Sequence, residues 1–161
     1  MRLLKMLLVL LVCAAAPAIA AGPLENGIAA YLRGDYATAL RILEPLAEDG
    51  DARAQVAVGM LNETGFGVKQ DYKAAAAWYR KAADKGNARA QYNLGALYER
   101  GDGVPQDLVQ ALKWYSLAAS RFGPSQLDIA DAVKMASVAL AARMKPAQIE
   151  EARKLAQEWR I

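Results

Sequence analysis

The chain has 161 residues, with 20 Lys and Arg against 17 Asp and Glu, and a formal net charge of +3 at pH 7. It has no histidine and a single cysteine, Cys13, which excludes Ser-His-Asp and Cys-His nucleophilic sites and the common zinc ligand sets. The length suits one domain with a sizeable core.

Residues 1–20 have the pattern of a cleaved secretory signal peptide. Arg2 and Lys5 precede the apolar run Met6–Ala16, and Ala18–Ala20 is a small-x-small cleavage site. The apolar run is shorter than the roughly 20 residues that span a bilayer. We therefore expect a signal peptide rather than a retained membrane anchor, and no stable membrane span after cleavage.

Cleavage changes the charge and the redox chemistry of the chain. Without Arg2 and Lys5, 18 Lys and Arg remain against 17 Asp and Glu, and no basic tract is left to bind nucleic acid. Cys13 leaves with the signal, so the mature chain has no disulfide. A lipid anchor on Cys13 is disfavoured, because Val12 is larger than the residue usual at that place. We expect a periplasmic or secreted protein.

Residues 22–50 predict a short helical hairpin, a degenerate first copy of the blocks that follow. The first helix is expected at about Pro23–Arg33. The segment Asp35–Gly50 aligns with the later Asp71–Gly86 and predicts the second helix. Pro45 lies inside this helix, where it removes a backbone donor and predicts a kink.

The centre of the chain is one block written twice. Residues 51–86 align without gaps with residues 87–122, a period of 36, and about half of the positions are identical. Repetition at such a period is typical of stacked helical arrays. The recurring pairs include Arg53 and Arg89, Gln55 and Gln91, Gly59 and Gly95, Gly65 and Gly101, Gly67 and Gly103, Asp71 and Asp107, Trp78 and Trp114, and Tyr79 and Tyr115.

Each block predicts two helices joined by a glycine-rich turn. Gly59 and Gly95 fall inside the first helix, where glycine costs about 1 kcal/mol relative to alanine and is tolerated if a neighbouring helix packs closely. Asp71 and Asp107 are placed to cap the second helix, and Asn87 to cap the next block. Glycine in the turn permits a positive φ.

An apolar stripe in the second helix of each block predicts a buried face. Ala75, Trp78, Tyr79, Ala82 and Ala83 are spaced i, i+3, i+4, i+7, i+8. We expect the aromatic members of this stripe in the core between helices, in preference to a sugar-stacking surface. These aromatic residues are Trp78, Tyr79, Trp114 and Tyr115.

Residues 125–161 predict two capping helices that close the open face of the array. Ser125 is placed to cap the first, at Leu127–Arg143, and Pro146 begins the second, in which Trp159 is expected to anchor the core. The stripe expected to be buried in the first of these helices consists of Ile129, Val133, Ala136, Leu140 and Met144.

The pattern Ala-x-Ala-Gln…Leu-Gly…Tyr…Gly-x-Gly-Val…Asp…Ala…Trp-Tyr…Ala-Ala resembles the Sel-one-like repeats, relatives of the tetratricopeptide repeats. The resemblance implies an all-α, right-handed α/α superhelix of helical hairpins over residues 21–161, with a C-terminal helical cap. It also implies an exported scaffold or adaptor that binds a protein or peptide on its concave face. We expect no catalytic, cofactor or metal site.

In tetratricopeptide relatives the first helix of each repeat lines the groove. By position, the groove here would hold Arg53, Val56, Met60, Glu63, Arg89, Tyr92, Asn93, Ala96, Glu99 and Arg100. Arg53 and Arg89 are placed to hold a carboxylate or an extended backbone. The alternative, of equal weight, is a set of solvated helix residues with local ion pairs. Glu63 and Glu99 share one repeat position, which favours a solvated or partner-facing role over a catalytic pair.

Two other functions stay open. One is an envelope enzyme, a β-lactam- or cell-wall-directed hydrolase, because some cysteine-rich members of the resembled family act on β-lactams. This chain lacks those cysteines and has no nucleophile constellation. The other is a peptidoglycan-binding module.

Overall fold

The computed structural model describes residues 22–123 and 126–159, and this part of the chain is all-α, with no strand. The helices are α1 (Pro23–Leu32), α2 (Tyr36–Glu48), α3 (Ala52–Thr64), α4 (Tyr72–Asp84), α5 (Ala88–Arg100), α6 (Leu108–Ala119), α7 (Leu127–Ala141) and α8 (Pro146–Glu158). The expected signal peptide and the Ser125 cap lie outside the described residues.

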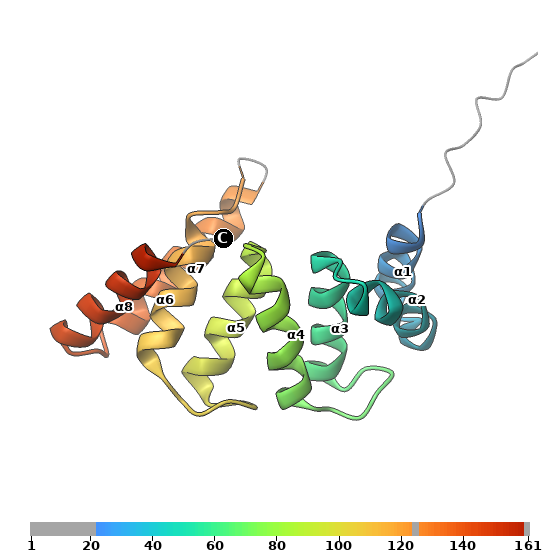
Figure 1. The fold of residues 1–161 in the computed structure, drawn as a ribbon, viewed down its shortest axis with the longest axis horizontal. Helices are drawn as coiled ribbons and strands as arrows, with labels where there is room; N and C mark the ends of the chain where they lie inside the picture. The colour runs from blue at the N-terminus through green and yellow to red at the C-terminus, as the bar shows by residue number, and fades with distance from the viewer. Residues whose placement is uncertain (1–21, 124–125, 160–161) are drawn as a thin grey trace, which may run out of the picture.

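The helices form a solenoid of hairpins, which confirms the predicted fold class. Figure 1 shows them side by side along the longest axis, with α1 and α2 at one end and α8 at the other. Each helix from α1 to α6 packs on the next one, and α6 packs on both α7 and α8. Because the main packing contacts join helices that are close in sequence, the fold is built from repeated local interfaces.

The helix ends are where the repeat pattern predicts them. The side chains of Asp71, Asn87 and Asp107 accept hydrogen bonds from backbone N–H groups in the first turns of α4, α5 and α6. Gly65 and Gly101 end α3 and α5 with φ of 75° and 78°. That left-handed conformation explains why glycine recurs there.

The glycines inside α3 and α5 give room to a tyrosine of the paired helix. A Cβ on Gly59 would lie 2.6 Å from Cε1 of Tyr79, and one on Gly95 would lie 2.8 Å from Cδ1 of Tyr115. Real Cβ atoms do not approach this closely. The predicted close approach of neighbouring helices is therefore confirmed at both positions.

Two buried glutamines connect consecutive hairpins in the same way. Gln55 is 2% exposed and Gln91 is 0% exposed. Nε2 of Gln55 donates to the Ala47 carbonyl at 2.9 Å, and Nε2 of Gln91 donates to the Ala83 carbonyl at 3.2 Å. Each amide thus satisfies a carbonyl near the end of the preceding hairpin, which explains why a polar residue recurs in the core.

The two tryptophans of the repeats differ in burial. Trp114 is fully buried, and its ring meets that of Trp159 edge to face at 6.0 Å. Trp159 itself is partly buried against the core, so the expectation that it anchors the core is met in part. Trp78 is only half-buried, with the Lys81 ammonium 4.0 Å from its ring centroid. The expectation of a core position is met in full by Tyr79, Trp114 and Tyr115, and in part by Trp78.

The predicted stripe of α7 is confirmed except at its first residue. Val133 and Leu140 are buried, and Ala136 and Met144 are partly buried against the same core cluster. Ile129, in the first turn of the helix, is 36% exposed, so the expectation that it lies in the core was wrong; Ala130 beside it is buried instead. The helix also ends at Ala141, two residues before the predicted end.

Pro45 does not end α2. The helix continues to Glu48, and the Pro45 carbonyl accepts a hydrogen bond from the Asp49 amide at 2.9 Å. The proline therefore removes one donor, while the helical hydrogen bonding resumes beyond it.

Candidate functional site

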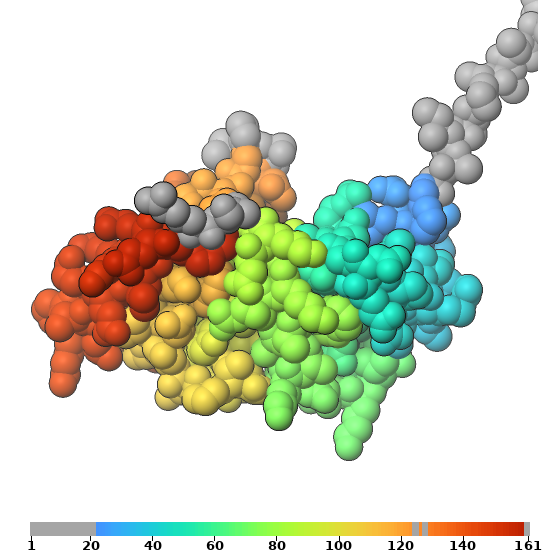
Figure 2. All heavy atoms as spheres, in the orientation of Figure 1, coloured from blue at the N-terminus to red at the C-terminus, as the bar shows by residue number. Residues whose placement is uncertain are grey.

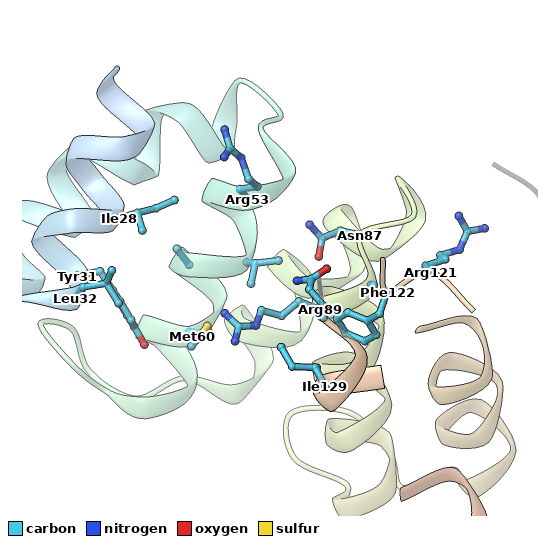
Figure 3. A pocket seen from close by; sticks show the side chains of 14 residues that line it. Ile28, Tyr31, Leu32, Arg53, Met60, Asn87, Arg89, Arg121, Phe122 and Ile129 are labelled. Atoms are coloured by element: carbon cyan, nitrogen blue, oxygen red, sulfur yellow. The ribbon is translucent and has the colours of Figure 1, made fainter. Parts of the chain in front are cut away.

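A pocket lies on the side of the solenoid formed by α1, α3 and α5. It has a volume of about 480 Å³. Figure 2 shows the surface hollowed between the N-terminal helices and α7, and Figure 3 shows the pocket from close by. The inner pocket, as we call it, is lined by Ile28, Tyr31, Leu32, Arg53, Val56, Ala57, Met60, Asn87, Ala88, Arg89, Arg121, Phe122, Gln126 and Ile129.

Helix α3 supplies the central strip of the inner pocket. Arg53, Val56, Ala57 and Met60 are spaced i, i+3, i+4, i+7 and therefore lie on one face of the helix. The lining residues of α1 have the same i, i+3, i+4 spacing. From α5, only the first turn contributes, with Arg89 as its charged group.

The far wall of the inner pocket comes from beyond the two repeats. Arg121, Phe122 and Gln126 belong to the connection between α6 and α7, and Ile129 to the first turn of α7. Sequence reasoning missed this wall. One signal for it was present, because Phe122 stands one period after Gly86, where the pattern has glycine.

The charged groups among the described lining residues are three arginines, with no carboxylate. Arg53 pairs with Glu25 at 3.3 Å, and both side chains are more than half exposed. The Arg121 guanidinium lies 4.8 Å from the centroid of the Trp159 ring. Arg89 is exposed and makes neither a hydrogen bond nor an ion pair with another described residue. The inner pocket therefore combines an apolar floor with a cationic rim.

The residues expected in a groove divide into two groups. Arg53, Val56, Met60 and Arg89 come together in the inner pocket. The others lie outside its lining: Glu63, Tyr92, Asn93, Ala96, Glu99 and Arg100.

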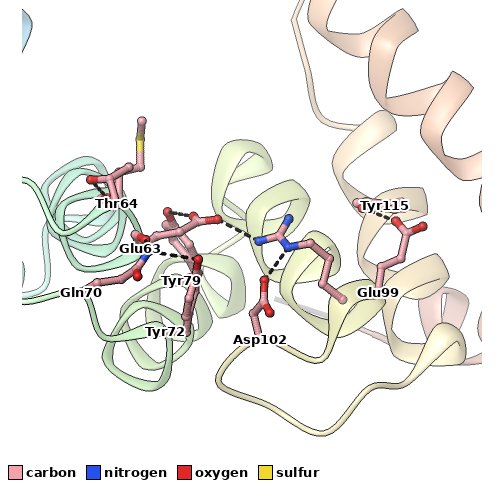
Figure 4. Close-up of polar contacts among 10 residues, drawn as sticks. Glu63, Thr64, Gln70, Tyr72, Tyr79, Glu99, Asp102 and Tyr115 are labelled. Carbon is pink, nitrogen blue, oxygen red and sulfur yellow. Dashed lines mark hydrogen bonds and ion pairs between the residues drawn. The ribbon is translucent and has the colours of Figure 1, made fainter.

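Glu63 is engaged within the chain (Figure 4). Its Oε2 accepts a hydrogen bond from the Tyr79 hydroxyl at 2.7 Å, and its Oε1 lies 2.9 Å from Nη2 of Arg100. Nε of Arg100 in turn lies 2.6 Å from Oδ2 of Asp102. Glu63 thus connects a tyrosine of its own hairpin to an arginine of the next.

Glu99 repeats this arrangement one period later. It accepts from the Tyr115 hydroxyl at 2.9 Å, and Nη1 of Arg143 lies 2.7 Å from its other oxygen. Burial, together with the neighbouring glutamate, raises the pKa of Tyr79 and of Tyr115. Glu63 and Glu99, which share one repeat position, therefore both bind a tyrosine and an arginine of the same chain.

Tyr92 and Asn93 also contact the tyrosines of the repeats. The ring of Tyr92 lies 5.5 Å from that of Tyr115. The Asn93 side chain lies near enough to the Tyr79 hydroxyl to oppose the rise of its pKa. These contacts place both residues at the interface between helices.

Two kinds of feature are absent from the described residues. Within them, no group of three or more His, Cys, Asp or Glu is placed to hold a metal ion. None of the helices described is both long enough and apolar enough to cross a membrane.

The recurring hairpins, glycine contacts and glutamine links define a helical-repeat solenoid. Residues 52–87 and 88–121 match the model of the Sel1 repeat, so the chain carries two Sel1 repeats. No curated protein matches the chain.

Two solved structures have a similar fold. One is c5321, described as a protective antigen of uropathogenic Escherichia coli strains with an SLR fold. It matches 85% of this chain at 27% identity, with a TM-score of 0.77. The other is a Sel1 repeat protein from Oxalobacter formigenes, which matches 63% of this chain at 38% identity, with a TM-score of 0.60. The matched region spans 29% and 40% of these two proteins.

Proposed function

We propose that this chain is an exported scaffold or adaptor that binds a protein partner in its inner pocket. The observation that carries the proposal is the composition of that pocket, in which apolar and arginine side chains converge from successive hairpins. Sel1-repeat proteins generally mediate protein–protein interaction and are typically non-catalytic. Curved stacks of helix pairs present extended binding surfaces for this purpose.

Export is part of the proposal. The positive residues, apolar run and small-residue site within residues 1–20 support it. The chain would then act in the periplasm or outside the cell, where the absence of cysteine from residues 21–161 keeps it independent of disulfide formation.

Photo-cross-linking tests the binding site. A photoreactive amino acid at Ala57, which lines the inner pocket, is expected to capture a partner in the envelope fraction. The same amino acid at Ala77, which is exposed on α4 outside the pocket, is the matched control. A partner captured equally at both positions, or only at Ala77, would contradict the proposed site. Fractionation of cells that express the full chain tests export.

A further inference from the structure

The charge and shape of the inner pocket indicate what kind of segment it takes. We propose that it binds an extended partner segment in which acidic side chains flank a bulky apolar residue. This inference rests on the proposed function and adds the chemistry of the partner.

The charged side chains that line the pocket are all positive. Arg53, Arg89 and Arg121 are the charged members of its described lining. Glu25, the carboxylate paired with Arg53, lies outside the lining, and that pair is exposed. Exposed pairs of this kind contribute little, about 0–1 kcal/mol, so a partner carboxylate can compete for Arg53. Electrostatic complementarity therefore favours an acidic segment.

Arg89 is the arginine best placed to bind such a segment. Among the described residues it has no ion-pair partner that a ligand would have to displace, and its guanidinium projects beside Met60 and Ile129 in Figure 3. Burial raises the pKa of Tyr31 on α1, and the positive charge of Arg89 opposes this rise. The guanidinium of Arg89 is therefore near enough to act electrostatically on the α1 side of the pocket. A guanidinium can bind a carboxylate through two parallel hydrogen bonds.

The arrangement of the arginines favours acidic side chains over a free chain terminus. The three residues come from α3, α5 and the α6–α7 connection, and Figure 3 shows them apart around the pocket. A single terminal carboxylate would contact one of them and leave the others unmatched. Several carboxylates along an extended segment match all three.

The apolar floor of the pocket is the reason for proposing a bulky apolar residue in the partner segment. The apolar members of the lining include Val56 and Met60 from α3 and Phe122 and Ile129 from the far wall. The volume of about 480 Å³ is large enough for an aromatic or leucine side chain. Burial of such an anchor supplies affinity, while the surrounding charges select the segment.

Fluorescence anisotropy with labelled synthetic peptides tests the proposal on the mature chain. Three C-terminally amidated probes alternate leucine with aspartate, asparagine or lysine, and a fourth carries the asparagine sequence with a free C-terminal carboxylate. The variants are Arg89→Glu and Arg53→Glu in the pocket. Arg41→Glu is the control, because Arg41 is exposed on α2 outside the pocket and its replacement changes the net charge equally. Thermal unfolding confirms that each variant is folded.

We expect the aspartate probe to bind most tightly and to weaken as salt is added. Arg89→Glu should reduce its affinity about tenfold or more, in line with the loss of a charge-assisted contact, while Arg41→Glu should change it less than about twofold. The photoreactive group at Ala57 should cross-link to this probe.

Other outcomes overturn the inference. Equal binding of the aspartate, asparagine and lysine probes, with no effect of Arg89→Glu, would mean that charge does not select the partner, although the pocket would remain a binding site. Preference for the free C-terminus would replace acidic side chains with a terminal carboxylate. Binding of no probe would reject the acidic segment, and the cross-linking comparison of Ala57 with Ala77 would then decide the proposed function separately.

Discussion

Arg143 binds Glu99 as Arg100 binds Glu63, with nitrogen–oxygen distances of 2.7 Å and 2.9 Å. Arg100 lies 37 residues after its glutamate, within the next repeat, whereas Arg143 lies 44 residues after its own, just beyond the end of α7. The glutamate–arginine ion pair is therefore present at the end of the second repeat, although the 36-residue sequence pattern does not continue into α7. The segment just after α7 thus supplies an arginine equivalent to the one that the first helix of the next repeat supplies to Glu63.

The ion pair between Glu99 and Arg143 predicts a measurable loss of stability when the charge of Glu99 is removed. In Glu99→Gln, the charge-assisted contact with Arg143 and the strong acceptor for Tyr115 are both weakened, and we expect a loss of about 1–2 kcal/mol in the free energy of unfolding. Glu150→Gln is the control, because Glu150 pairs with Arg153 on an exposed face of α8 and its loss should cost less than about 0.5 kcal/mol. Urea denaturation of both variants checks this, and equal losses would contradict a structural role for Glu99.

The burial of Trp114 predicts a large effect of its removal. Trp114→Ala deletes a fully buried indole and should cost about 3–5 kcal/mol. Trp78→Ala, at the same repeat position but half-buried, should cost clearly less, about 1–3 kcal/mol. Chemical denaturation measures both. A loss below about 1 kcal/mol for Trp114→Ala would be incompatible with the packing described.

The contact between Gly95 and Tyr115 predicts that alanine is harmful inside α5. Gly95→Ala improves helix propensity by about 1 kcal/mol, yet its Cβ would lie 2.8 Å from the tyrosine ring. We expect a net loss of about 1–3 kcal/mol, because the ring must move. Gly123→Ala is the control for added bulk alone, since Gly123 lies outside the helices and a Cβ there meets no described atom within 4 Å. A thermal shift assay that finds Gly95→Ala as stable as the native chain would exclude the tight contact.

The raised pKa of Tyr79 predicts a loss of stability at alkaline pH. Burial, with the Glu63 carboxylate, raises this pKa above its ordinary value of 10.0 in the folded chain. Above about pH 10 the unfolded chain therefore binds fewer protons than the folded chain, and stability falls by up to about 1.4 kcal/mol per pH unit for this group. Tyr79→Phe should be less stable at neutral pH, because its bond to Glu63 is lost, but should show a shallower fall from about pH 10 to pH 12. Parallel slopes for the two proteins would contradict the shift.

The repeat period predicted most of the fold because it reports packing directly. Gly59 and Gly95 indicated where helices approach closely, and Asp71, Asn87 and Asp107 indicated where they begin. Beyond the repeats this information ends. In α7 the apolar spacing identified the buried face at Val133, Ala136 and Leu140. It did not show how far along the helix the neighbouring elements reach, so Ile129 in the first turn was wrongly assigned to the core.

The inner pocket was only partly predictable for a related reason. The positions of Arg53 and Arg89 follow from the repeat, but the far wall depends on how a non-repeating segment folds back. Glu63, Glu99 and Arg100 were placed in the groove by position on a helix. Glu63 and Glu99 bind tyrosines 16 residues further along the chain and arginines 37 and 44 residues further along, and Arg100 also binds Asp102, two residues away. Position on a helix alone does not identify these partners.

The two glutamate–arginine ion pairs affect how rigidly the hairpins are joined. Each joins a hairpin to the next through partly exposed charges, whereas the Gln55 and Gln91 side chains that join them are buried. Salt weakens the exposed ties and leaves the buried links nearly unchanged. At higher ionic strength, neighbouring hairpins should therefore change their relative orientation while the buried glutamine hydrogen bonds hold them together. The curvature of the solenoid should then depend on the salt concentration, which small-angle scattering can measure.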